Sequence, residues 1–502
     1  MNLGQARLRL VQGGAALATG LLIAGCGSTY RPVVTPITPS GPPAQPTSYA
    51  IVVSAPSTST PGIATIIDYS GDSVLAIAPI GVGPTTFTID EVGGNGYTVN
   101  SDGTLSNFPL TSSLQAKSVA YTTLPSTAAP VNLYSPSSGL YVADLTGNVV
   151  DVFSGFPQTF KLAIPVANTP IMVMGASLAG QRQFAISQGN SLGGTVSGGL
   201  ACNTSPTTAT LGEADGIEVS SLTVSSQIPL GKCPVFALES SDARRLFVLN
   251  RGDDTISVIN VQDNTLDSCT PFLNQNGQLV TCHPTLPLSL SAVTATGITP
   301  PNGTAGMIAT AGPIYAEYNA ATAQLVVADY DGGTISVIDV SEDEYGNDSQ
   351  TFGTTYTIPV GNNPASVTVL ADGSRAYTAN QTDQTVTVVT LGSHTVEKTL
   401  PITGHPRTVV STQNSLYGKV YVDSPDTPYL TILRTDLDIV DTAILVEGNI
   451  VDVRVTTQAG TSGNSNNVSR TPGYGQPCYL PPSLEPAPTG GQTPLQVCRM
   501  LP

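Results

Sequence analysis

Acidic side chains recur where apolar, strand-like runs of the sequence end, and they could either bind a metal ion or cap turns. Asp253 and Asp254 follow a run that ends at Asn250, and Asp329 and Asp331 hold the same place after a later run. Carboxylate oxygens at variable spacing suit Ca²⁺. Asp and Asn in turns also bond their own backbone, and such a role predicts that they recur in every copy of a repeat. We favour the structural role and keep Ca²⁺ as the alternative.

A second group of side chains could polarise a carbonyl or bind an anion. His405 and Arg407 flank a proline, and Arg454 lies in a later strand-like run together with Asp452. Histidine can exchange protons, and arginine binds carboxylate and phosphate groups. A histidine in this setting is more often a plain loop residue. These three residues are the catalytic candidates of the chain, but no complete catalytic set accompanies them, so we expect a noncatalytic protein.

Three other features do not indicate chemistry. Residues 189–193 match the G-x-S-x-G motif of serine hydrolases, but that motif requires a strand-to-helix turn in an α/β sheet. His283 and His394 have no acidic or nucleophilic neighbour in a recognisable pattern. The acidic segment 339–348 lacks the spacing of an EF-hand loop and is interpreted as a solvated insertion.

The N-terminus carries a bacterial export signal. Two arginines precede an apolar run that is too short to span a membrane stably. The run ends in Ile-Ala-Gly-Cys at 23–26, which resembles the lipobox of bacterial lipoproteins. The resemblance implies that residues 1–25 are removed and that Cys26 carries acyl chains such as palmitate, which anchor a soluble domain to a bilayer. Gly27, where an inner-membrane retention signal would place Asp, implies the outer membrane or the cell surface.

Composition limits the partners. Residues 26–48 are rich in Pro, Ser and Thr and should form an extended tether. The formal net charge is −17, which disfavours nucleic acid as a partner. We therefore expect contact with a membrane through the lipid, and a protein or glycan as ligand.

Six cysteines remain besides Cys26, and an even number in an exported chain predicts disulfides. Six cysteines permit 15 pairings, among which the sequence alone does not choose. We expect nearest neighbours to pair, because each bond would then close an insertion or the tail: Cys202 with Cys233, Cys269 with Cys282, and Cys478 with Cys498.

The elements that must position these side chains are strands. Residues 361–404 contain four runs with period-two alternation and many β-branched residues, separated by Gly, Asp, Asn and Pro. Similar runs precede this segment, and repetition at this period indicates four-stranded blades of an all-β propeller. A proline opens seven inner strands, and an eighth inner strand is expected at 449–457: Pro84, Pro130, Pro170, Pro234, Pro313, Pro364 and Pro406.

The count of inner strands predicts eight blades, with seven as the alternative. The first strands lack an inner partner and the last inner strand lacks outer ones, so the two ends of the chain should share one blade. The propeller would span 49–459, with insertions at 190–213 and 263–306, and 460–502 would form a Gly/Pro/Ser-rich tail. This topology should place the strand-end residues on one face, around the channel mouth, with His405, Arg407 and Arg454: Asp144, Asn250, Asp253, Asp254, Asp329, Asp331, Asn380, Asp383, Asp423 and Asp426.

The strand pairs carry a family resemblance. Runs such as Leu-Phe-Val-Leu-Asn at 246–250 and Ala-Tyr-Thr-Ala-Asn at 376–380, each followed by a Thr-rich strand, resemble the YVTN family of β-propeller repeats. The resemblance implies a secreted or surface-anchored propeller of undefined ligand. Related propellers include lactonases similar to 6-phosphogluconolactonase. The leading hypothesis is thus a lipid-anchored binding or scaffold module, and the alternative is a lactonase-like hydrolase at the channel mouth.

Lipidation of Cys26 is testable by fractionation. Cys26→Ser removes the thiol that would accept the lipid, so the full chain should move from the membrane fraction to the soluble fraction. The variant Ser28→Ala, two residues away, should stay in the membrane fraction. A Cys26→Ser protein that still sediments with membranes would show that the lipobox is misread.

Overall fold

The computed structural model describes residues 49–90, 93–125, 128–136, 139–175, 181–189, 211–288, 311–412, 415–416 and 418–456. These residues form β-strands and one 3-10 turn, η1 (Ala116–Ser118), with no α-helix. Nothing in these ranges is a helix of the length and hydropathy needed to cross a bilayer. The predicted signal, tether and tail, with Cys26, Cys478 and Cys498, lie outside them.

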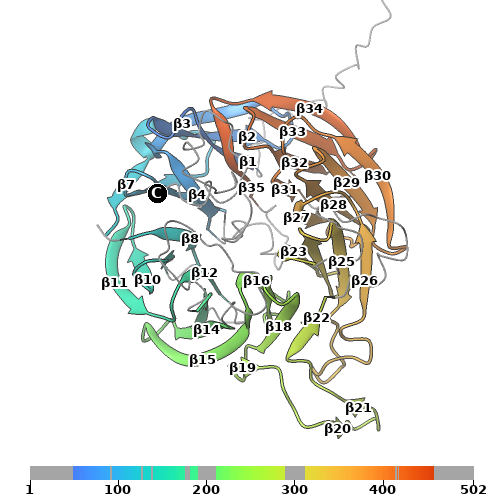
Figure 1. Ribbon diagram of the computed structural model, residues 1–502. Helices are drawn as coiled ribbons and strands as arrows, with labels where there is room; N and C mark the ends of the chain where they lie inside the picture. Colours follow the sequence, from blue (N-terminus) through green and yellow to red (C-terminus); the bar gives the residue numbers. More distant parts are fainter. Residues whose placement is uncertain are drawn as a thin grey trace, which may run out of the picture. The chain divides into compact units, whose positions relative to one another are not determined.

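Eight antiparallel sheets are arranged as the blades of one propeller, which confirms the predicted fold and the count of eight (Figure 1). Blade 1 contains β35 (Asn449–Val455), β1 (Tyr49–Ala55), β2 (Pro61–Asp68) and β3 (Val74–Val82); blade 2 contains β4 (Pro84–Ile89), β5 (Asn95–Asn100), β6 (Thr104–Pro109) and β7 (Ala120–Thr123); blade 3 contains β8 (Pro130–Tyr134), β9 (Leu140–Asp144), β10 (Val149–Ser154) and β11 (Thr159–Pro165); blade 4 contains β12 (Pro170–Gly175), β13 (Arg182–Ser187), β14 (Leu211–Glu218) and β15 (Thr223–Lys232).

The second half of the ring follows the same order, from the inner strand to the outer one. Blade 5 contains β16 (Pro234–Glu239), β17 (Arg245–Asn250), β18 (Thr255–Asn260), β19 (Thr265–Leu266) and β22 (Thr285–Pro287); blade 6 contains β23 (Pro313–Asn319), β24 (Gln324–Asp329), β25 (Thr334–Asp339) and β26 (Thr355–Pro359); blade 7 contains β27 (Pro364–Val369), β28 (Arg375–Asn380), β29 (Thr385–Thr390) and β30 (Thr395–Pro401); blade 8 contains β31 (Thr408–Ser411), β32 (Lys419–Asp423), β33 (Tyr429–Arg434) and β34 (Ile439–Leu445).

The ring is closed by the two ends of the described chain. β1 pairs with β35 in antiparallel register, with Ile51 opposite Arg454 and Val53 opposite Asp452. The predicted shared blade is therefore confirmed. The pairing matters because a closed ring leaves no open radial seam, and the backbone groups of β1 and β35 bond each other.

Six of the seven predicted prolines open their inner strands as expected, whereas blade 8 begins at Thr408 rather than at Pro406. The residue before the proline has a positive φ in several blades, as at Gly83 (59°) and Gly312 (61°). Glycine adopts this left-handed conformation without a Cβ penalty. A Cβ at Gly312 would also overlap the Asp331 carboxylate. Both facts explain why Gly-Pro recurs at the start of blades.

Burial falls from the inner strand to the outer one. All residues of β27 are buried, whereas most residues of β30, the outermost strand of the same blade, are exposed. Inner strands contact neighbouring blades on both faces, so they lose the alternation that marks the outer strands. The core therefore lies between the blades.

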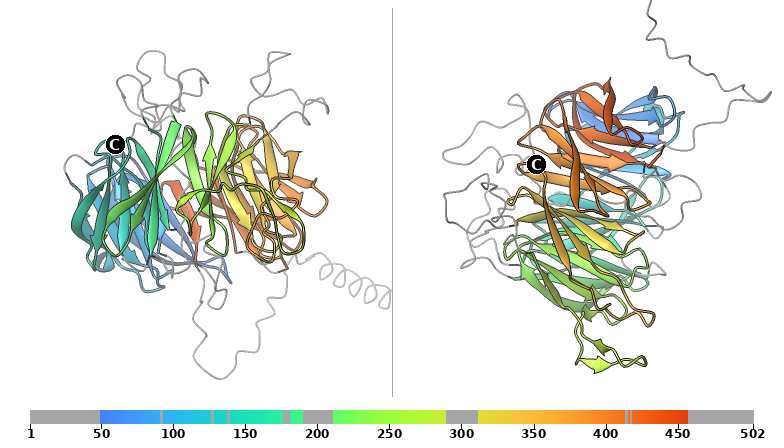
Figure 2. Two further views of the ribbon diagram at one scale, coloured as in Figure 1. Left: turned by 90° about the horizontal axis from the view of Figure 1, so that it is seen from below. Right: turned by 90° about the vertical axis from the view of Figure 1, so that its right-hand side faces the viewer.

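The outer strand of blade 5 is interrupted by an insertion. β19 and β22 both pair with β18, and the chain between them forms a hairpin of β20 (Phe272–Leu273) and β21 (Leu279–Val280). The predicted Cys269–Cys282 disulfide closes the base of this insertion. Figures 1 and 2 show the hairpin projecting outward beyond the blades.

The two predicted insertions are only partly described. Residues 190–210 and 289–310 lie outside the described ranges. β14 begins at Leu211, so the end of the predicted 190–213 insertion belongs to a strand instead. Cys233 is disulfide-bonded, and its predicted partner Cys202 lies outside the described residues.

Closure of the ring can be tested by its contribution to stability. Ile51 is fully buried in β1, and Ile51→Ala should lower the free energy of unfolding by about 2–5 kcal/mol through lost burial and a residual cavity. Ile77→Ala in β3 of the same blade removes a side chain that is 52% exposed and should change it by less than about 0.5 kcal/mol. Equal effects in urea denaturation would argue against a packed closing blade.

Candidate functional site

The strand-end amides and acids bond to hydroxyls at the start of the next strand. Asn250 donates from Nδ2 to the hydroxyls five and seven residues later, at 3.1 and 2.9 Å. Asn380 makes the same two bonds at 3.0 and 2.8 Å. Asp329 accepts from Thr334 and Ser336 at 3.0 and 2.6 Å. One bond pattern thus fixes the turn between the second and third strands in three blades.

The other acids considered as Ca²⁺ ligands are also engaged. Asp331 forms a two-bond ion pair with Arg251 at 3.0 and 3.2 Å. Asp254 accepts a backbone N–H bond of 2.8 Å, and Asp253 accepts one of 2.9 Å from Lys232. Within the described ranges no group of three or more His, Cys, Asp or Glu is arranged to hold a metal ion. Ca²⁺ binding stays a prediction without support from this geometry.

His405 lies beside an acid and an amide. Its Nδ1 is 2.8 Å from Oδ2 of Asp426, and its Nε2 is 3.2 Å from Nε2 of Gln384. The Asp426 carboxylate also accepts the backbone N–H of His405 at 2.8 Å. Asp426 thus fixes both the loop and the imidazole.

The two arginine candidates belong to a buried ion cluster between blades 8 and 1. Arg407 lies 3.6 Å from Asp423 and donates to the carbonyl of Val451, and Arg454 pairs with Asp452 at 2.8 Å. Burial raises the pKa of Asp423 to about 7, although Arg407 opposes this rise. The arginines compensate acids within the fold, so they are poorly placed to receive a substrate anion.

A recurring basic residue links neighbouring blades and was missed by sequence reasoning. It is the first residue of the second strand, and it reaches the turn between the third and fourth strands of the next blade. Lys419 pairs with Asp72 at 2.6 Å, Arg375 pairs with Asp438, and Arg182 donates to the carbonyl of Val261 at 2.8 Å. The signal available in the sequence was Arg or Lys at one repeat position: Arg182, Arg245, Arg375 and Lys419.

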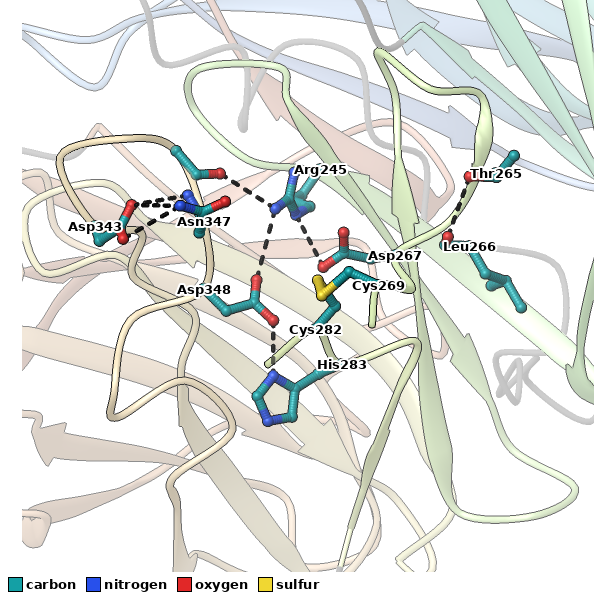
Figure 3. Close-up of a disulfide and its surroundings, with 11 residues drawn as sticks. Arg245, Thr265, Leu266, Asp267, Cys269, Cys282, His283, Asp343, Asn347 and Asp348 are labelled. Carbon is teal, nitrogen blue, oxygen red and sulfur yellow. Dashed lines mark hydrogen bonds and ion pairs between the residues drawn. A yellow bond between two sulfur atoms is a disulfide. The ribbon is translucent and has the colours of Figure 1, made fainter. Parts of the chain in front are cut away.

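Arg245 is the most elaborate of these links (Figure 3). Its guanidinium lies 3.4 Å from Asp267 of the insertion, and 3.8 and 3.6 Å from Glu342 and Asp348 of the loop after β25 in blade 6. The Arg245 side chain is 7% exposed. A buried cation requires nearby anions, and here they come from two segments that are distant in sequence. We call the insertion 263–288 and the loop 340–354 together the hairpin platform.

Two acids that lie near Arg245 are partly desolvated. Burial raises the pKa of Asp267 to about 6, with Arg245 opposing the rise and Asp348 adding to it. Burial also raises the pKa of Glu342. On the far side of Asp348, His283 lies 2.7 Å away through Nδ1 and stacks on Phe352.

Two sequence interpretations are corrected by this cluster. His283 does have an acidic neighbour, because the disulfide and the loop of blade 6 bring Asp348 to it. The acidic segment 339–348 is not simply solvated, since Asp348 is buried and Glu342 is half-buried. His394, the third histidine, stacks on Tyr356. None of these contacts was visible as a local pattern.

Comparison with known proteins supports the fold alone. No family model and no curated protein matches the chain. The structure of apo AztD from Citrobacter koseri is similar with a TM-score of 0.53 and 11% identity, over 81% of this chain and 97% of that one. The dihydro-heme d1 dehydrogenase NirN, solved in complex with DHE, has a TM-score of 0.51 and 13% identity, over 83% and 77%.

A putative 6-phosphogluconolactonase from Bacteroides fragilis reaches a TM-score of 0.49 at 14% identity, over 83% of this chain and 99% of that one. At this level of similarity it lends no support to the lactonase alternative. The similarity to AztD and NirN supports the β-propeller fold of this chain. The resemblance to YVTN repeats and to lipoproteins stays a prediction.

The strand-end acid of blade 6 predicts a pH dependence. Burial raises the pKa of Asp329 to about 7, so the folded state retains a proton that the unfolded state loses near pH 4. The contribution of Asp329 to the free energy of unfolding is therefore fully present below pH 4 and is lost as the pH rises toward 7. Asp329→Asn supplies the residue found in blades 5 and 7. It should stabilise the protein at pH 7 by more than about 1 kcal/mol, since one pKa unit corresponds to about 1.4 kcal/mol.

The reciprocal change is the control. Asn380→Asp should introduce the same loss of stability between pH 4 and 7 in blade 7. Urea denaturation at both pH values measures both effects. A stability difference between wild type and Asp329→Asn that does not depend on pH would contradict the protonated state of Asp329.

Proposed function

We propose that this chain is a noncatalytic β-propeller, anchored outside the cytoplasm by lipid on Cys26, which binds a protein or a glycan through the hairpin platform. The observation that carries the proposal is the clamp at Arg245, which holds a projecting hairpin of blade 5 against a loop of blade 6. A rigid projection loses little conformational entropy on binding, which favours affinity.

Three independent ties support the interpretation of the hairpin platform as a preformed surface. The Cys269–Cys282 disulfide closes its base. The ion pairs of Arg245 join the insertion of blade 5 to the loop of blade 6. At its tip, Asn276 donates to Glu344 at 2.6 Å. Insertions on a rigid scaffold are common sites of recognition.

The contacts of the three catalytic candidates favour binding without catalysis. His405, Arg407 and Arg454 each lie beside a carboxylate, that of Asp426, Asp423 or Asp452. A lactonase would need an unoccupied electrophilic or basic group near the substrate carbonyl. The described contacts favour a structural use of these side chains.

Site-specific photo-crosslinking in cells tests the proposal. In the full chain, a photoreactive amino acid at Gln275, an exposed residue of the hairpin turn, should give a discrete crosslinked adduct with the partner. The same amino acid at Ser393, an exposed turn residue of blade 7, should not give that adduct. No adduct at Gln275, or hydrolysis of sugar lactones by the purified chain that is lost in His405→Ala, would refute the proposed function.

A further inference from the structure

The two faces of the β20–β21 hairpin differ in exposure. Phe272 lies opposite Val280, and Leu273 lies opposite Leu279. Residues that are opposite in an antiparallel pair share a face. On one face Val280 is 1% and Phe272 is 44% exposed, whereas on the other Leu273 and Leu279 are 67% and 53% exposed. The first face is therefore partly covered, and the second presents a pair of leucines to solvent.

One edge of the hairpin is held by the loop of blade 6. Gln350 donates from Nε2 to the backbone carbonyl of Leu279 at 2.8 Å. Asn274, at the start of the turn, lies 3.5 Å from Asp343. β21 therefore faces the loop.

The other edge, that of β20, has no strand partner in the part of the chain that the structure describes, where β20 pairs with β21 alone. The N–H of Asn274 donates to the carbonyl of Gln278 at 2.9 Å, and hydrogen-bonded and non-hydrogen-bonded pairs alternate along an antiparallel ladder. Leu273 belongs to a non-hydrogen-bonded pair, so its backbone N–H and C=O point away from β21. Proteins usually protect such an edge with lysine or another charge, but β20 consists of Phe and Leu.

The two segments of the hairpin platform carry charges of one sign. Segments 263–288 and 340–354 contain no lysine or arginine. They contain six acids: Asp263, Asp267, Glu342, Asp343, Glu344 and Asp348. Arg244 and Arg245, at the start of β17, both pair with Glu342, and Arg245 also pairs with Asp267 and Asp348. Among the described residues no arginine or lysine pairs with the other three acids, Asp263, Asp343 and Glu344. The whole chain carries a net charge of −17, so a second copy would be repelled and a basic partner attracted.

We propose that β20 binds an extended segment of a partner protein in which apolar residues alternate with lysine or arginine. This inference rests on the proposed binding function. The segment would add to the outer edge of β20 as a third strand. Its backbone would form hydrogen bonds with the N–H and C=O of Leu273 that point away from β21. Main-chain hydrogen bonds of this kind provide the affinity when a peptide adds to a sheet edge. Its apolar side chains would cover Leu273 and Leu279, and its cations would face the acids of the hairpin platform.

The test uses two synthetic peptides of equal length and the full chain. A fluorescent peptide of alternating lysine and valine should bind, and one of alternating glutamate and valine should not. The double variant Leu273→Asn/Leu279→Asn should weaken binding of the lysine peptide at least about tenfold, which corresponds to about 1.4 kcal/mol. Because both leucines are exposed, the variant should unfold at the same temperature as wild type. Val396→Asn, at a 42% exposed position of β30, should bind the lysine peptide like wild type.

Hydrogen exchange identifies the mode of binding. The amide of Leu273 should exchange more slowly when the lysine peptide is present. Equal binding of both peptides, or binding that the double variant leaves unchanged, would overturn the inference. A dimer that the double variant dissociates would instead assign the surface to a second copy. If the crosslinked adduct at Gln275 still forms, any of these results would contradict this inference without contradicting the proposed binding function.

Discussion

A single buried cation determines how the hairpin platform is built. The guanidinium of Arg245 cannot be hydrated freely, so it requires acids close by. Asp267 comes from the insertion of blade 5, and Glu342 and Asp348 come from the loop of blade 6. Because the acids lie on both segments, the charge requirement of one side chain holds two segments of different blades together. Breaking a buried pair of this kind typically costs about 3–5 kcal/mol.

The propeller supplies the frame in which this link becomes possible. The pairing of β1 with β35 closes the ring. In blades 4, 5, 7 and 8 the second strand begins beside the connection between the third and fourth strands of the next blade. In blades 7 and 8 the link is a plain ion pair, Arg375 with Asp438 and Lys419 with Asp72. In blade 5 the residue at the same position is Arg245. It contacts two longer segments, the insertion of blade 5 and the loop 340–354 of blade 6, instead of one short turn. The hairpin platform is thus an elaboration of a contact that the ring repeats.

Much of the frame could be predicted from the sequence, because it depends on local rules. Prolines without a ladder donor mark strand openings, period-two runs mark strands, and the unpaired first and last strands predict closure. The Cys269–Cys282 bond followed from proximity in sequence and is confirmed. The clamp could not be predicted, because the contacts of Arg245 and His283 depend on how two insertions meet in space. The role of Arg245 was nevertheless detectable from the basic residue at the same repeat position in blades 4, 7 and 8.

Hydrogen exchange of an Arg245→Met variant tests the central claim most directly. Methionine keeps the apolar volume but leaves the acids without their cation. Faster exchange is expected at the amides of Asn274 and Asn347, which are bonded within the hairpin and the loop, while the inner strands β16 and β23 exchange as in wild type. Unchanged exchange at both amides would show that Arg245 does not hold the hairpin against blade 6.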